Sequence, residues 1–201
     1  MTGIVFPIPF EPGVDMFEQM RHMTDDEFYF FCQENPDYKF ERDANGNIKP
    51  MAQTGGESGI RNSELTTDLT IWNRKKRLGV VFDSSTGFNL PNGANRGPDA
   101  AWVSDAQWNQ LTLEQRKKFP PLCPDFVVEL LSESDTLKGT AEKMREYMDN
   151  GCRLAWMIDP KTEEVRIYRA DGSVSIVHGF DNLLSGEDVL PDFSFALQVL
   201  R

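Results

Sequence analysis

Histidine and cysteine are scarce in this chain of 201 residues, which contains two histidines and three cysteines. His22 and His178 match no pattern of histidine, cysteine or nucleophile, so the sequence indicates neither a catalytic triad nor a histidine metal site. The cysteines, Cys32, Cys123 and Cys152, are odd in number, far apart in the sequence and without a Cys-x-x-Cys pair. This usage fits reduced intracellular thiols better than disulfides or a zinc site.

Long hydrophobic runs and net positive charge are also missing. No apolar run approaches a membrane span, and the opening MTGIVFPIPF lacks the features of a signal peptide, so we expect a cytoplasmic protein without a membrane partner. The net charge of −11 argues against a protein that grips long nucleic acid by general electrostatics. Two basic runs, at 74–77 and 116–118, could meet phosphate locally, but solvated helix ends explain them more simply.

The composition is that of an ordinary globular protein, with 39% hydrophobic and 26% charged residues. The length suits one domain with a full core, and we expect a single domain over residues 23–201. Residues 1–22 contain Pro7, Pro9 and Pro12 and show no steady period, so they are expected to form an irregular arm.

Local patterns predict an α/β protein in which a mixed sheet is flanked by helices and carries additional hairpins. Capping boxes at Thr24–Glu27 and Thr112–Gln115 predict two short helices. Apolar residues at helical spacing predict a longer helix after the glycine-rich loop Thr54–Gly59, which lacks the ending of a phosphate-binding loop. Strands are expected at 38–42, 48–51, 80–90 (one bent strand or two short ones), 97–103, 126–131, 153–158, 164–168 and 174–178.

The central element of the chain is the apolar run Phe126–Leu131, which has the pattern of a strand buried on both faces and is interrupted only by Glu129. A buried, ionised glutamate is costly unless it is paired, hydrogen-bonded or bound to a metal. The helix expected after Thr136 offers Lys143 and Tyr147, which lie one turn apart on its flank. Glu129 is therefore either part of a functional site or the structural mate of a basic residue.

A second carboxylate in an apolar strand, Asp99, precedes Glu129 by 30 residues. These two acids and Lys143 could converge at one end of a sheet. Two hard oxygen ligands suit Mg²⁺ or Mn²⁺, which can hold a phosphodiester oxygen while water attacks, and the lysine could position that water or stabilise charge on phosphorus. Simpler interpretations are a Pro-Asp turn at Asp99 and, for Glu41, an ordinary charged residue of a hairpin.

Several segments taken together resemble a known family. They are FERDANGNI, GGESGIRNSEL, VFDSSTGF, GPDAAWV, PDFVVELLSESD, EKMREYMDNGCRLAWMIDP, VRIYRADG and GEDVLPDF. With these segments in this order, the chain is similar to the Uma-type endonucleases, which are abundant in cyanobacteria and belong to the PD-(D/E)XK restriction-endonuclease-like superfamily. The likeness runs from about Met23 to the C-terminus and implies a restriction-endonuclease-like α/β core with a metal-dependent phosphodiesterase site.

The resemblance also implies roles for individual residues. Asp99 matches the aspartate of the superfamily signature, Glu129 the following acidic residue, and Glu41 the glutamate in the hairpin of the family. Asp99, Glu129 and the backbone carbonyl of Leu130 would then bind Mg²⁺, or Mn²⁺ in its place. Glu41 would assist the metal or its water.

The chain departs from the superfamily pattern at two positions. Leu131 stands where the superfamily has a lysine, and Ser58 stands where many relatives have histidine. Lys143 matches a lysine in the next helix of the family, so the positive charge is expected to have migrated there. It would orient water or stabilise the transition state, with Tyr147 hydrogen-bonding at the rim.

The first hypothesis is thus a Mg²⁺-dependent endodeoxyribonuclease, a hydrolase that acts on DNA. A homodimer is expected, because cutting both strands of a duplex commonly brings two sites together. The alternative is a binding or interaction module that keeps the nuclease scaffold without turnover, which Leu131 and the acidic balance favour. Metal affinity separates the two hypotheses.

Overall fold

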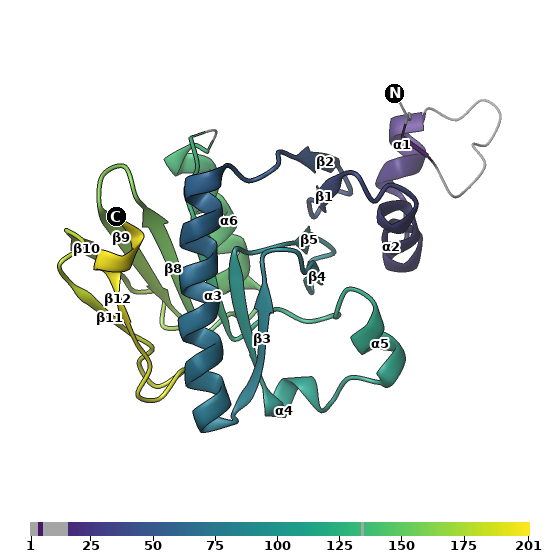
Figure 1. Ribbon diagram of the computed structural model, residues 1–201. Coiled ribbons are helices and arrows are strands. Elements are labelled where there is room, and N and C mark those ends of the chain that lie inside the picture. Colours follow the sequence, from purple (N-terminus) through teal and green to yellow (C-terminus); the bar gives the residue numbers. More distant parts are fainter. Residues whose placement is uncertain (1–3, 6–15, 134) are drawn as a thin grey trace. The chain divides into compact units, whose positions relative to one another are not determined.

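A computed structural model describes residues 4–5, 16–133 and 135–201 (Figure 1). The chain divides into two compact units. The smaller unit comprises Met1–Gln53, Gly87–Gly97 and Thr112–Leu122, and the larger unit comprises Thr54–Thr86, Pro98–Leu111 and Cys123–Arg201. Each unit is therefore assembled from segments that are distant in the sequence.

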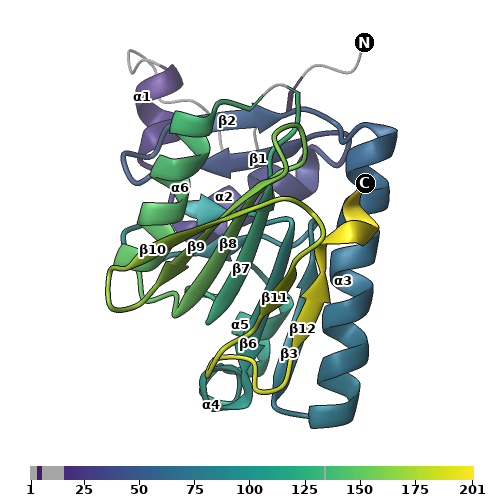
Figure 2. The same cartoon turned by 90° about the vertical axis from the view of Figure 1, so that its left-hand side faces the viewer.

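The larger unit is built around a six-stranded sheet with the order β10-β9-β8-β7-β6-β3 (Figure 2). Only β7 and β8 pair in parallel, and their neighbours pair antiparallel, so the sheet is mixed as the sequence predicts. The strands are β3 (Gly79–Asp83), β6 (Ala100–Ser104), β7 (Phe126–Leu130), β8 (Leu154–Asp159), β9 (Glu164–Arg169) and β10 (Val174–His178).

Helices lie on both faces of this sheet (Figures 1 and 2). One face is covered by α3 (Gly56–Lys76), by the hairpin of β11 (Leu183–Ser185) and β12 (Ser194–Ala196), and by the short helix η1 (Leu197–Leu200). The other face is covered by α6 (Leu137–Asp149). A short helix, α4 (Asp105–Trp108), follows β6.

The main core of the larger unit forms between α3 and the sheet. Leu65, Leu69 and Trp72 of α3 are buried against alternate residues of β6, β7 and β8, among them Val128 and Leu130. Each buried side chain of this size contributes about 1.5–3 kcal/mol. Because side chains alternate along a strand, the intervening residues of β7 face α6 instead.

The helix α6 begins and ends where its sequence predicts. Thr136 accepts a hydrogen bond from the Gly139 N–H (3.1 Å), and Gly151 follows the helix with a φ of 100°. Its buried face differs from the expected stripe: Leu137 is 42% exposed, whereas Tyr147 is fully buried. The reason is that the first turn of α6 lies at a pocket, while Tyr147 reaches the sheet.

In the part of the smaller unit that the structure describes, there are three helices and a four-stranded sheet. The helices are α1 (Met16–Arg21), α2 (Asp25–Glu34) and α5 (Leu113–Lys117). The sheet has the order β2-β1-β5-β4, with β1 (Lys39–Arg42), β2 (Ile48–Met51), β4 (Phe88–Asn89) and β5 (Asn95–Arg96). Both predicted capping boxes are present, and the predicted hairpin pairs Lys39–Arg42 with Ile48–Met51. Its core is Met23, Phe28, Phe31 and Phe40.

The region 80–90 forms two short strands, one of the two arrangements that the sequence predicts, with β3 in the larger unit and β4 in the smaller. Most of the expected arm, residues 1–22, lies outside the described residues, but Met16–Arg21 form helix α1.

Among the described residues, no helix has the length and apolar character to cross a membrane. The three cysteines are free thiols, and burial raises the pKa of Cys32 to about 12.

Candidate active site

Glu129 lies one residue before the end of β7, a strand in which all residues are buried. Glu129 as a whole is 8% exposed. Its neighbours Val128 and Leu130 belong to the core on the α3 face. The alternation of the strand therefore directs the Glu129 side chain to the face covered by α6.

Two side chains of α6 contact the Glu129 carboxylate. Lys143 Nζ lies 2.8 Å from Glu129 Oε1, and the Tyr147 hydroxyl donates a hydrogen bond of 2.9 Å to the same oxygen. The Lys143 and Glu129 side chains are 16% and 10% exposed, so this is a largely buried ion pair. The sequence predicts Tyr147 at the rim of the site, but in the structure Tyr147 is fully buried. The pair supplies the compensation that a buried carboxylate requires.

Asp99 lies beside the same end of β7. It directly precedes β6, and because β6 and β7 are antiparallel, the start of one strand meets the end of the other. The Asp99 N–H donates to Val128 O (3.0 Å), and Asp99 Oδ2 accepts from the N–H of Leu130 (2.8 Å). The half-buried Asp99 carboxylate is therefore bound to the backbone of Leu130, the residue that follows Glu129. Lys143 is thus paired with Glu129, and Asp99 is bound to the backbone of the residue after Glu129.

Glu41, the fourth candidate, belongs to the smaller unit. It lies on β1, is 4% exposed, and forms an ion pair with Arg96 (Oε2 to Nη1, 3.1 Å). Its other oxygen, Oε1, accepts a hydrogen bond from the N–H of Gly97 (3.1 Å). Glu41 therefore holds the backbone two residues before Asp99 in the sequence.

A model of the Uma2 family, described as "Putative restriction endonuclease", matches residues 25–198. The chain belongs to the Uma2 family.

The fold of this chain is similar to that of a protein whose structure has been solved. The chain superimposes with a TM-score of 0.72 on a "putative nuclease belonging to DUF820" from Anabaena variabilis ATCC 29413, at 18% identity, covering 89% of this chain and 97% of that one. A DrdV-DNA complex matches with a TM-score of only 0.40, at 17% identity over 62% of this chain and 10% of that chain, and this score is too low to indicate a shared fold. No curated protein matches significantly.

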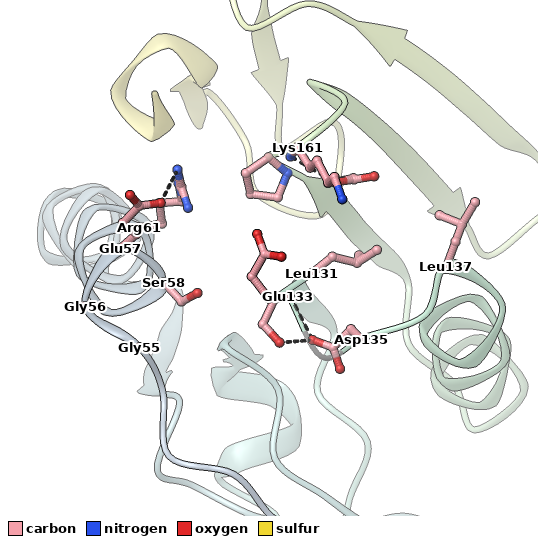
Figure 3. Close-up of a pocket in the computed structure, with 13 residues that line it drawn as sticks. Gly55, Gly56, Glu57, Ser58, Arg61, Leu131, Glu133, Asp135, Leu137 and Lys161 are labelled. Atoms are coloured by element: carbon pink, nitrogen blue, oxygen red, sulfur yellow. Dashed lines mark hydrogen bonds and ion pairs between the residues drawn. The ribbon is translucent and has the colours of Figure 1, made fainter.

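A pocket of about 490 Å³ adjoins these elements of the Uma2 protein (Figure 3). Ser58 and Arg61 come from the first turns of α3, Leu131 and Glu133 from the segment after β7, and Lys161 from the turn after β8. Leu131 lines this pocket and brings no charge to it. Four carboxylates and two basic residues line the pocket, so its charge does not favour an anion.

The donor set of the site suits a hard divalent cation. Among residues 4–5, 16–133 and 135–201, no group of three or more histidine, cysteine or acidic side chains could hold a metal. Mg²⁺ does not require such a cage, because it keeps several waters and is usually bound through one or two carboxylates. Glu129 on β7 and Asp99, which is bound to the backbone of Leu130, are two such carboxylates. The residues present therefore fit Mg²⁺.

The sequence analysis missed one residue that contacts Asp99, Asn62. Its Nδ2 donates a hydrogen bond of 2.9 Å to Asp99 Oδ1. A signal was present in the sequence, because Asn62 continues the apolar stripe of Leu65, Leu69 and Trp72 at helical spacing. A polar residue in such a stripe needs a partner, and here the partner is Asp99.

Proposed function

We propose that this protein is a Mg²⁺-dependent endonuclease that hydrolyses phosphodiester bonds in DNA. The observation that carries the proposal is the arrangement at the end of β7, where Glu129 is paired with Lys143 and Asp99 binds the next backbone N–H. Membership of a family described as restriction endonucleases supports the reaction and the DNA substrate. Two carboxylates beside a buried cation combine metal-binding oxygen with a positive charge for the phosphate.

Three groups of the chain hold the cation in this proposal: the Asp99 carboxylate, the Glu129 carboxylate and the carbonyl oxygen of Leu130. Bound Mg²⁺, or Mn²⁺ in its place, supplies a Lewis acid for a phosphate oxygen and lowers the pKa of water. The hydrogen bond from the Leu130 N–H fixes the Asp99 carboxylate at the end of β7. The Tyr147 hydroxyl fixes Glu129 in the same way from α6.

Lys143 serves as the cation that orients the attacking water or stabilises charge on phosphorus. Its Nζ is held by Glu129 and lies 5.9 Å from the centre of the Tyr147 ring. A lysine ammonium is a compact charge with three donors, so it can keep one contact to Glu129 and offer another to a phosphate or water. In this role it replaces the lysine that Leu131 does not provide.

Glu41 assists the site, and its hydrogen bond from the Gly97 N–H supports a role in positioning the segment that leads to Asp99. We further propose that the active form is a homodimer, because two copies would provide one site for each strand of a duplex. Sedimentation of the purified protein, alone and with a DNA duplex, measures that assembly directly.

The test of the function is Mg²⁺-dependent nicking of supercoiled plasmid. We expect the wild type to convert the plasmid to the open-circular form, and Asp99→Ala to remove that conversion. A matched control for Lys143 is available on the same helix: Lys138 is 88% exposed and lies 3.9 Å from Glu142. Lys143→Met should lose nicking, whereas Lys138→Met should retain it. Wild-type protein that leaves the plasmid intact at millimolar Mg²⁺ and Mn²⁺ would contradict the proposal.

A second candidate function is a binding or interaction module without turnover. The observation that favours it is Leu131, which leaves the lysine position of the superfamily uncharged. Metal binding decides between the two functions. Calorimetry with Mg²⁺ should reveal a site that Glu129→Ala removes if the protein is an enzyme, and no site at millimolar metal if it is the module.

A further inference from the structure

Asn62 occupies an unusual position for a polar residue. It lies on the face of α3 that continues into Leu65 and Leu69, two residues of the main core, and it is only 8% exposed. One turn earlier on the same face, Ser58 lines the pocket. Asn62 therefore lies on α3 between Ser58, which lines the pocket, and Leu65, which belongs to the hydrophobic core.

The amide of Asn62 is only half satisfied. Its Nδ2 donates to Asp99 Oδ1 at 2.9 Å, whereas its Oδ1 is buried and has no hydrogen-bond partner among the described residues. The orientation follows from the contact, because a carboxylate only accepts and must face the amide N–H groups. Burying an unpaired carbonyl oxygen costs stability, so a residue present only for packing would be apolar here.

Asn73, on the same helix, shows how a structural asparagine is satisfied. Its Nδ2 donates to Gly79 O (2.8 Å) and its Oδ1 accepts from Trp102 Nε1 (3.0 Å). Both halves of that amide join α3 to the sheet. Asn62 joins α3 to Asp99 with one half and leaves the other half unused within the protein, which is the expected cost of a residue placed for function.

We propose that Asn62 is a positioning residue of the candidate active site: its N–H fixes the Asp99 carboxylate, and its Oδ1 is an additional neutral oxygen donor for the divalent cation or its water. This inference rests on the function proposed above. Asp99 is held through both carboxylate oxygens, by Asn62 from α3 and by the Leu130 N–H from β7. A carboxylate clamped in this way is oriented before the cation arrives, which raises affinity.

The binding experiment uses the full-length protein and Mn²⁺ alone, with free Mn²⁺ measured by electron paramagnetic resonance. We expect Asn62→Leu to weaken Mn²⁺ binding by about tenfold to a hundredfold, the size of effect seen when a partner of a metal ligand is removed. Asn62→Ala serves as a second variant in case the larger side chain prevents folding. In plasmid nicking, both variants should need correspondingly more Mg²⁺ for half-maximal rate, whereas the rate at saturating Mg²⁺ should change by much less, because the lost interaction acts on metal binding.

The stability measurement separates positioning from structure. Without metal, Asn62→Leu should melt at the same temperature as the wild type or higher, because it removes an unsatisfied buried oxygen. The matched control, Asn73→Leu, should melt lower and bind Mn²⁺ with unchanged affinity, because it breaks two satisfied hydrogen bonds about three helical turns along α3 from Asn62.

The outcomes are distinct. Unchanged Mn²⁺ affinity in Asn62→Leu and Asn62→Ala overturns the role of Asn62 and leaves the proposed function standing. Losses of melting temperature and Mn²⁺ affinity that run in parallel also overturn it, because they identify a structural residue. Wild-type protein that binds no Mn²⁺ overturns the metal site itself and the role of Asn62 with it.

Discussion

Each of the two units has a buried glutamate on a strand: Glu129 on β7 in the larger unit and Glu41 on β1 in the smaller. Glu129 in the larger unit is 8% exposed and pairs with Lys143 at 2.8 Å. Glu41 in the smaller unit is 4% exposed and pairs with Arg96 at 3.1 Å. Burial and pairing are therefore nearly the same in the two units. By these two criteria alone, neither glutamate can be assigned to function or to structure.

The remaining contacts of the two glutamates differ. Glu41 accepts a hydrogen bond from the backbone of Gly97, so its carboxylate braces a chain segment. The side chains of Lys143 and Tyr147 contact Glu129. A second carboxylate, that of Asp99, accepts a hydrogen bond from the N–H of the next residue, Leu130. Arginine is the usual partner in a fixed ion pair, whereas lysine is a compact and more adaptable charge. These contacts are consistent with the roles proposed above, in which Glu129 binds the metal and Glu41 assists the site.

The largest effect is expected for Glu129→Gln, which keeps the shape of the side chain and removes its charge. Metal-dependent nicking should fall to background, while the free energy of unfolding without metal should change by less than about 2 kcal/mol. The change is small because glutamine still accepts from Tyr147 and Lys143 can turn toward water. Chemical denaturation and the plasmid assay measure the two quantities. A stability loss of about 3–5 kcal/mol with retained nicking would make Glu129 a structural partner.

Removing the two cations sharpens the comparison. Lys143→Met and Arg96→Met each leave a buried glutamate without its basic partner, and each should destabilise the protein by up to about 3–5 kcal/mol. Only Lys143→Met should also remove nicking from the protein that remains folded. The measurement is nicking rate per folded molecule at a temperature below both transitions. Equal nicking by the two variants would show that the difference between lysine and arginine has no functional meaning.

A smaller effect is expected for Glu41→Gln. The glutamine oxygen still accepts from the Gly97 N–H, so the loss of stability should be about 1 kcal/mol. Affinity for Mg²⁺, measured by calorimetry, should fall by about tenfold, because the segment leading to Asp99 is held less firmly. Unchanged affinity would leave Glu41 with a structural role only.

The smallest effect concerns a half-buried glutamate, Glu27, in the capping box of α2. The hydrogen bonds from the Thr24 N–H and hydroxyl lower the pKa of Glu27 below its ordinary value of 4.5. A carboxyl pKa lowered by folding stabilises the protein above about pH 4.5, and this contribution is lost as the pH falls through the folded-state pKa. Glu27→Gln, which can still form the capping box, should therefore cost less than about 0.5 kcal/mol at pH 7 and nothing at pH 2. Denaturation at both pH values checks this.

The sequence by itself determined the features that depend on neighbouring residues. Capping boxes at Thr24 and Thr112, the hairpin around Asp43–Asn47 and the α6 boundaries were predictable, because their hydrogen bonds join residues a few positions apart. The burial of β7 and the need of Glu129 for a partner followed from its apolar neighbours. The pairing of Lys143 and Tyr147 with Glu129 was predictable in outline, since both lie on one flank of the next helix.

Only the tertiary structure decided which of these elements meet. The hydrogen bond from Asn62 to Asp99 joins residues 37 positions apart, and that from Gly97 to Glu41 joins residues 56 apart. Local preferences carry no information about such contacts, because they depend on strand order and on the face that each helix covers. The division of residues 80–90 between two units has the same cause. The sequence could therefore identify the carboxylates and the lysine, while the fold alone decided which residue clamps Asp99.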